Sequence, residues 1–251
     1  MAEGRYVYGI IRGEEPRTFE AQGIWSEAGQ VCTVNAAGLG AVVSDSPVVD
    51  YERSRRNMMV HTLALEEVMR QHTVLPVRFG TVAPNEGAGI PRLLERRSGE
   101  FHSLLDEMEG RVELGLKVFW REERLFQEIV EEYPDIRRLR DATAGKSAEA
   151  AHYERIRLGE MVAEAIKRKR ESEAELLLNR LSPAAYKCRS NPVLGEKMVL
   201  NAAFLVDRAG EDEFAASIGA LDSEMADRRV FKYIRPAPPY NFVNLIISWN
   251  E

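Results

Sequence analysis

The sequence Val112-Glu-Leu-Gly-Leu-Lys-Val-Phe-Trp120 alternates imperfectly between apolar and polar residues and is rich in β-branched and aromatic side chains, which is typical of a β-strand. The segments that follow it alternate between helical and extended patterns: a charged helical region at 121–181, strands at 184–190 and 198–206, a helix at 211–226 and a strand at 230–234. The resulting order β–α–β–β–α–β is that of a ferredoxin-like fold. We therefore predict an α+β protein with two domains, whose C-terminal domain at 111–236 is ferredoxin-like (βαββαβ) with a long helical insertion.

The residues before this stretch, 1–110, predict a separate N-terminal α+β domain. Its expected elements are a strand at 6–11, a hairpin of strands 30–34 and 39–44, helices at 50–71 and 91–110, and a strand at 74–80 interrupted by Pro76. In the first of these helices, Met58, Leu65, Val68 and Met69 recur at helical spacing. We expect that stripe to face the core.

The charged region at 121–181 contains one long helix whose apolar stripe lapses across Lys167–Glu173. This segment carries the basic run Lys167-Arg-Lys-Arg170 between glutamates. We expect it to project into solvent, so that neutralising the run changes stability by no more than about 0.5 kcal/mol.

The composition excludes several classes of function. The 251 residues contain 34 basic and 40 acidic side chains, a net charge of −6, which argues against non-specific nucleic-acid binding. The longest uncharged stretches are shorter than the ~18–20 apolar residues of a membrane span, so no lipid membrane is expected as a partner. Two cysteines, Cys32 and Cys188, build no disulfide framework, which favours a reduced, cytoplasmic compartment.

No sequence motif predicts an active site. The segment Ala144-Gly-Lys-Ser147 lacks the first glycine of a phosphate-binding loop, because Arg140 stands in its place. The four histidines show no metal-ligand spacing, and we expect them at the surface or half-buried. We therefore expect no enzymatic activity, no cofactor and no metal, and favour a binding or assembly role.

The C-terminal segment 237–251 opens with a stiff proline-rich stretch and continues with an apolar tail. Tyr240–Trp249 holds seven large apolar or aromatic side chains and no charge. Because exposed apolar surface of this size is unfavourable, we expect the tail to dock on the N-terminal domain. Two alternatives remain open: an added edge strand in the second domain, and a free handle for a partner.

Several stretches together resemble the gas vesicle protein F/L family. In chain order they are Tyr6-Val-Tyr-Gly-Ile10, Val74-Leu-Pro-Val-Arg-Phe-Gly-Thr81, Glu113-Leu-Gly-Leu-Lys-Val118, Asn201-Ala-Ala-Phe-Leu-Val206 and Pro238-Pro-Tyr-Asn-Phe-Val243. The chain departs from the family pattern at Arg235 and Ala237, which stand where the family usually has glycine and tryptophan. Any role of that tryptophan is therefore in doubt.

The resemblance implies a non-enzymatic accessory protein of gas vesicle formation. Its partners would be the small hydrophobic vesicle wall protein and other gas vesicle accessory proteins, and it would be cytoplasmic or retained as a minor component on the gas-facing side of the vesicle. We expect partner binding or tail docking to involve Arg78, Phe79, Pro239, Tyr240, Phe242 and Trp249. The alternative function is a small-molecule-binding or regulatory module built on the ferredoxin-like domain.

Overall fold

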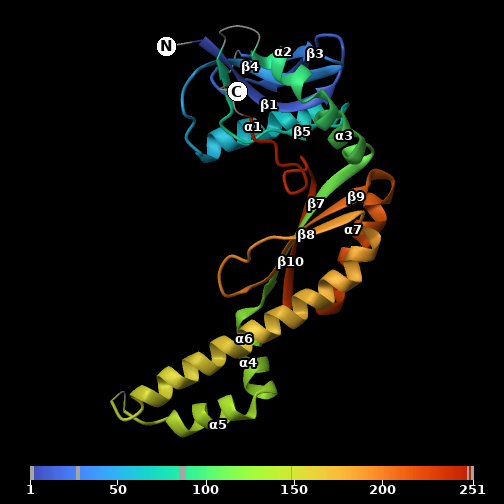
Figure 1. Ribbon diagram of the computed structural model, residues 1–251. Coiled ribbons are helices and arrows are strands. Elements are labelled where there is room, and N and C mark those ends of the chain that lie inside the picture. The colour runs from blue at the N-terminus through green and yellow to red at the C-terminus, as the bar shows by residue number, and fades with distance from the viewer. Residues whose placement is uncertain (1–2, 27–28, 85–88, 148, 248, 250–251) are drawn as a thin grey trace. The chain divides into compact units, whose positions relative to one another are not determined.

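The computed structural model describes residues 3–26, 29–84, 89–147, 149–247 and 249, and it shows a mixed α+β fold with antiparallel sheets. The chain forms two compact units, each with its own sheet (Figure 1). Unit 1 comprises Met1–Glu113, Asp207–Ala209 and Pro236–Glu251, and unit 2 comprises Leu114–Val206 and Gly210–Arg235.

Unit 1 is built on a sheet with β1 in its interior. Along the described residues the strand order is β2 (Thr18–Gln22), β3 (Gln30–Ala36), β4 (Leu39–Pro47), β1 (Glu3–Arg12) and β5 (Leu75–Pro76), while β6 (Val82–Pro84) also pairs with β1. From Tyr6 to Ile11, β1 is buried throughout. The predicted strand at 6–11 and the predicted hairpin are confirmed. The sequence did not predict the short strand β2, whose residues alternate between exposed and half-buried positions.

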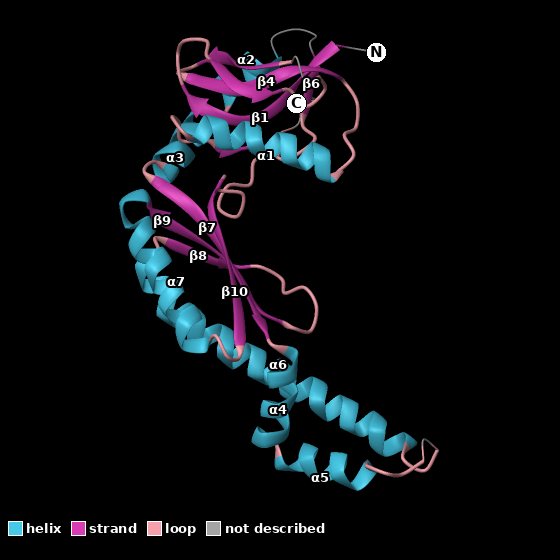
Figure 2. Cartoon of the chain, turned by 180° about the vertical axis from the view of Figure 1, so that it is seen from behind, coloured by secondary structure: helices cyan, strands magenta, loops and turns pink. Residues whose placement is uncertain are grey.

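Helices cover both faces of this sheet. Helix α1 (Arg55–Met69) lies on one face and α2 (Gly89–Arg96) on the opposite face, with α3 (Ser98–Met108) following it (Figures 1 and 2). The prediction of one continuous helix at 91–110 was wrong, because the backbone leaves helical geometry at Arg97 (φ −103°, ψ 17°). Ser98 and Gly99 follow this break, and glycine in particular weakens a helix.

The C-terminal tail contacts several segments of unit 1. The backbone N–H and the side-chain amide of Asn241 donate hydrogen bonds of 2.8 and 2.6 Å to the carboxylate of buried Glu113. Leu245 forms a parallel bridge with Val77, and the guanidinium of Arg97 donates to the carbonyl oxygen of Ile246 (2.9 Å). The tail is thus linked to the loop after β5, to α3 and to the start of β7.

Unit 2 contains most of a four-stranded sheet. Its strands, in spatial order, are β10 (Arg229–Ala237), β7 (Arg111–Trp120), β9 (Met198–Asp207) and β8 (Lys187–Ser190). Figure 2 shows α7 (Glu211–Met225) and the C-terminal half of α6 (His152–Leu181) along one side of this sheet. The shorter helices α4 (Glu122–Glu132) and α5 (Pro134–Thr143) pack on α6.

The expectation that Lys167–Glu173 projects into solvent was wrong. Lys169 is only 9% exposed, and its ammonium group lies 2.6 Å from Glu132, 3.0 Å from Glu128 and 3.5 Å from Glu173. Burial lowers the pKa of Lys169, but hydrogen bonding to Glu132 and Glu128 and the negative charges of Glu128 and Glu173 together outweigh it, and the net shift is upward. The lapse in the apolar stripe therefore marks a buried ionic cluster.

Glu173 connects this cluster to the sheet of unit 2. Its carboxylate accepts a hydrogen bond from the indole N–H of Trp120 (2.6 Å) and pairs with buried Arg229. The neighbouring Arg170 lies over the Trp120 ring and donates to the carbonyl oxygen of Met198 (3.0 Å). The charged segment of α6 thus packs against β7, β9 and β10.

Replacing a buried tail residue should destabilise unit 1. We expect Leu245→Ala, which removes a fully buried side chain beside Val77, to lower the free energy of unfolding by about 3 kcal/mol. The matched control Ile246→Ala, at an exposed neighbouring position, should change it by less than about 0.5 kcal/mol. Urea denaturation measures the free energy of unfolding of both variants. If the two variants lose the same amount, the buried contact of Leu245 with Val77 does not stabilise the protein.

Removing the cation from the ionic cluster should destabilise unit 2. Lys169→Gln removes the cation that contacts all three carboxylates and leaves Glu132 without its buried partner, while Arg229 still pairs with Glu173, and we expect a loss of about 3 kcal/mol in unfolding free energy. Lys167→Gln, at an exposed position two residues earlier, is the control and should stay within about 0.5 kcal/mol of wild type. A Lys169→Gln variant as stable as the control would show that the cluster contributes nothing.

Candidate functional site: an aromatic pocket and an apolar ridge on unit 1

A cavity of about 320 Å³ in unit 1 brings together three of the residues singled out from the sequence, Arg78, Phe79 and Tyr240. Helix α1 contributes His61 and Thr62 to its wall. The cavity is therefore formed by α1, by the segment after β5 and by the tail. We call it the Tyr240 pocket.

A hydrogen-bonded tyrosine–histidine pair lies beside this pocket. The hydroxyl oxygen of Tyr6 accepts the backbone N–H of Gly80 (3.0 Å) and lies 3.0 Å from Nδ1 of His61. Of these two contacts the backbone N–H can only donate, so Nδ1 is the one that can accept the hydroxyl proton of Tyr6. Neutral His61 then carries its proton on Nε2, and that atom finds no hydrogen-bond partner among the described residues.

Burial determines the protonation state of this pair. His61 is 1% exposed, and burial lowers its pKa from 6.5 to about 4, so the ring is neutral near pH 7. Burial also raises the pKa of Tyr240 to about 12, although a hydrogen bond with Thr62 acts in the opposite direction. The imidazole of His61 and the hydroxyl of Tyr240 are therefore both neutral near pH 7.

Aromatic rings enclose His61. Phe79 approaches its ring edge-on at 5.6 Å, and Tyr240 stacks on it at 6.3 Å with an interplanar angle of 29°. Gly80 adopts a positive φ of 86°, a conformation that favours glycine, and turns the chain so that its N–H meets the Tyr6 hydroxyl. The motif around Arg78 and Phe79 is thus held in place by the buried strand β1.

Next to the pocket, α1 exposes large apolar side chains. Met58, Met59 and Leu63 are 40%, 50% and 54% exposed, and we call these three residues the α1 ridge. The expectation that Met58 faces the core was wrong: the buried face of α1 consists of His61, Ala64, Leu65 and Val68. Met58 instead lines the Tyr240 pocket, so that ridge and pocket are continuous.

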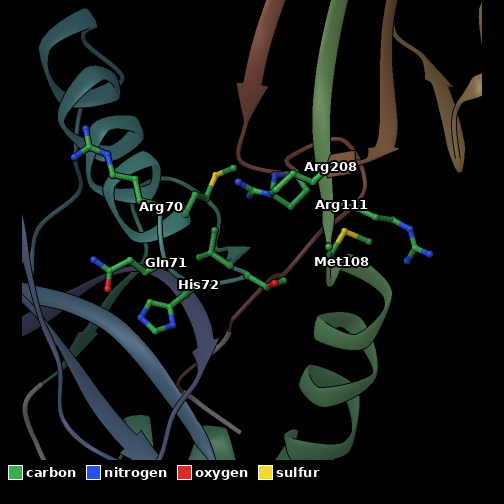
Figure 3. Close-up of a pocket in the computed structure, with 11 residues that line it drawn as sticks. Arg70, Gln71, His72, Met108, Arg111 and Arg208 are labelled. Carbon is green, nitrogen blue, oxygen red and sulfur yellow. The ribbon is translucent and has the colours of Figure 1, made fainter. Parts of the chain in front are cut away.

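A second cavity in unit 1, of about 310 Å³, has Pro239 in its wall. Arg70, Arg111 and Arg208 also line it, but Figure 3 shows the guanidinium groups of Arg70 and Arg111 pointing away from one another. Arg70 pairs with Glu67 (2.8 Å) and Arg111 with Asp207 (3.1 Å). These arginines do not converge on a common ligand position.

The remaining expected site residues lie elsewhere. Phe242 is half-buried in the tail turn, where its N–H donates to the carbonyl oxygen of Pro239 (3.1 Å), and Trp249 lies beside Gly89 at the start of α2. The prediction that the histidines are at most half-buried was wrong for His61. Its position four residues before Leu65 and seven before Val68 was the sequence signal for the buried face.

Two kinds of site are not observed in the described part of the chain. No three His, Cys, Asp or Glu side chains there are grouped so that they could hold a metal ion. Within the same residues, no helix is both long and apolar enough to cross a membrane.

Comparison with known proteins gives a consistent result. The family model of gas vesicle synthesis protein GvpL/GvpF matches residues 4–244. The chain belongs to this family. It is similar to gas vesicle protein F of Streptomyces sp. strain CB03234, with 32% identity over 95% of this chain and 98% of that protein. Gas vesicle protein F of Nostoc sp. strain PCC 7120 is 28% identical over 98% of this chain and 100% of its own length.

Solved structures of family members have the same fold. The crystal structure of GvpF from Anabaena sp. PCC7120 superimposes with a TM-score of 0.82 at 27% identity, covering 98% of this chain and all of that one. GvpF from Microcystis aeruginosa gives a TM-score of 0.78 at 26% identity, covering 96% and 99%. The predicted family and the predicted role in gas vesicle formation are thus confirmed.

The buried His61 should make the stability of this family member depend on pH. Its folded-state pKa of about 4 lies below the unfolded value of 6.5, so its contribution is complete above pH 6.5 and is lost as the pH falls toward 4. We expect about 2 kcal/mol of His61-dependent stability to disappear between pH 7 and pH 5.

Urea denaturation at both pH values measures this loss. His61→Gln should show a pH dependence smaller by about 2 kcal/mol. His152→Gln, which removes an exposed histidine, controls for loss of a histidine as such. If His61→Gln retained the full wild-type dependence, another group would be responsible.

Proposed function

We propose that this protein is a non-enzymatic accessory factor that binds the small hydrophobic wall protein through the α1 ridge and the Tyr240 pocket during vesicle assembly. The observation that carries the proposal is the α1 ridge itself. Its three large side chains stay 40–54% exposed on a helix whose other face is well buried. Covering each of them would contribute up to ~1.5–3 kcal/mol.

The chemistry of a gas vesicle explains why such a surface is useful. A subunit that builds a gas-tight apolar wall aggregates when it is free in water, because its apolar surface associates with other apolar surfaces. A partner that covers this surface with its own apolar ridge keeps the subunit available for assembly. Methionine suits this purpose, since its flexible side chain adapts to the surface it meets.

The finer architecture is also part of this proposal. The strand order β10-β7-β9-β8 and the βαββαβ sequence of elements support a ferredoxin-like second domain with a long helical insertion. The tail contacts to Glu113, Val77 and Arg97 support docking of 237–251 on the N-terminal domain. We place the protein in the cytoplasm during assembly and, as a minor component, in the vesicle, and we expect other accessory proteins to bind it as well.

Co-purification tests the α1 ridge. The full-length protein is co-expressed with a small gas vesicle wall protein, and the amount of wall protein retained on the tagged chain is measured. Leu63→Glu places a charge in the ridge, and we expect at least a tenfold loss of retained wall protein, equivalent to about 1.4 kcal/mol.

The control has the same substitution at a different exposed leucine. Leu194→Glu lies in unit 2, between β8 and β9, and should retain the wild-type amount. Thermal unfolding of both variants checks that each is folded. Undiminished binding by Leu63→Glu would exclude the ridge as the binding surface.

A further inference from the structure

His61, which lines the Tyr240 pocket, holds a buried hydrogen-bond donor that has no acceptor among the described residues. Nε2 of His61 carries the imidazole proton, because Nδ1 accepts from Tyr6, and no described residue accepts from Nε2. Leaving a buried donor unpaired is energetically costly. A ligand atom that accepts a hydrogen bond from Nε2 recovers this energy, so the pocket favours such a ligand.

The other polar groups of the pocket favour an anion. Arg53 and Arg78, both exposed, line it and no acidic residue does, although, besides burial, the negative charges of Glu66 and Glu113 reach the Tyr240 hydroxyl and raise its pKa. Met58, Phe79 and Leu245 provide apolar walls. The cavity therefore combines an apolar lining with donors and cations, which fits a carboxylate on a short apolar stem.

The start of α1 adds to the positive potential at this site. Ser54 caps the helix by accepting the N–H of Asn57 (3.3 Å), and the first turn contains no acidic residue. It contains Arg55 and Arg56 instead. Acidic side chains are the usual complement of the partial positive charge at a helix N-terminus, so a negative charge is missing here from the chain itself.

We propose that the Tyr240 pocket binds a carboxylate side chain of the wall protein, with the carboxylate accepting from His61 Nε2 and paired with Arg53 and Arg78. The proposal rests on the proposed function, since the same partner covers the adjoining α1 ridge. Met58 belongs to both surfaces, so one apolar segment bearing one acidic residue spans them. Because Nε2 is buried, the entering group has to displace Tyr240, which stacks on the His61 ring and is 41% exposed.

A small carboxylate tests the pocket without the wall protein. The full-length chain, labelled with ¹⁵N-histidine, is titrated with propionate at pH 7, and with propionamide at matched ionic strength as the neutral isostere. We expect propionate to shift the His61 Nε2 resonance saturably, and propionamide to bind at least about tenfold more weakly. The double variant Arg53→Gln/Arg78→Gln should weaken propionate binding at least about fivefold.

The control variant changes the net charge equally at another place. Arg137→Gln/Arg157→Gln removes two exposed arginines from α5 and α6, and should bind propionate as the wild type does. Absence of a saturable shift, or equal binding of propionamide, overturns the carboxylate site. If both double variants lose the same amount of propionate binding, the carboxylate site is also wrong, because the loss would then reflect only the change in net charge.

The two proposals fail in different experiments. If Leu63→Glu abolishes co-purification while propionate does not bind, the α1 ridge binds the wall protein and the carboxylate site is wrong. If propionate binds as expected but Leu63→Glu retains the wall protein, the pocket is a carboxylate site and the proposed function is wrong. With both supported, Arg53→Gln/Arg78→Gln should also reduce the retained wall protein at least about threefold.

Discussion

The two buried tyrosines of β1 impose the constraint on which unit 1 depends. Their hydroxyl groups lie in the core and must form hydrogen bonds there, because an unpaired buried polar group is costly. Tyr6 meets His61 of α1 and the N–H of Gly80, while Tyr8 meets Ser44 of β4 (2.9 Å) and the N–H of Ile24 (2.9 Å). A single strand thereby determines the position of a helix, of a neighbouring strand and of the loop that carries the Arg78 motif.

This constraint also produces the surface that we propose binds the wall protein. With His61 turned inward to Tyr6, the opposite face of α1 carries Met59 and Leu63 into solvent. The same histidine uses its Nδ1 for the core, while its buried Nε2 has no partner among the described residues. In the proposed carboxylate site, one side chain thus serves both stability and binding.

Unit 2 contains a buried cluster of charged side chains. A long helix with many glutamates and basic residues would be fully solvated if it were isolated, yet Lys169 and Arg229 are buried between Glu128, Glu132 and Glu173. A buried ion pair is weak evidence of added stability, because desolvation offsets much of the attraction. Its contacts are specific, however, since they join Glu128 of α4, Lys169 and Glu173 of α6, and Arg229 of β10.

The α+β class, the strand at Tyr6–Ile11 and the hairpin that precedes α1 were predictable from the sequence, because they follow from local periodicity. The family was predictable too, because its motifs occur in a fixed order along the chain. The sequence also singled out Arg78, Phe79 and Tyr240. It did not show that these residues share one cavity with His61. Tyr240 is more than 150 residues from Arg78 and Phe79 along the chain, and local patterns carry no information over that distance. Only the tertiary structure showed that Lys169 is buried and that Met58 is not, because burial depends on which distant segment covers a side chain rather than on its neighbours in sequence.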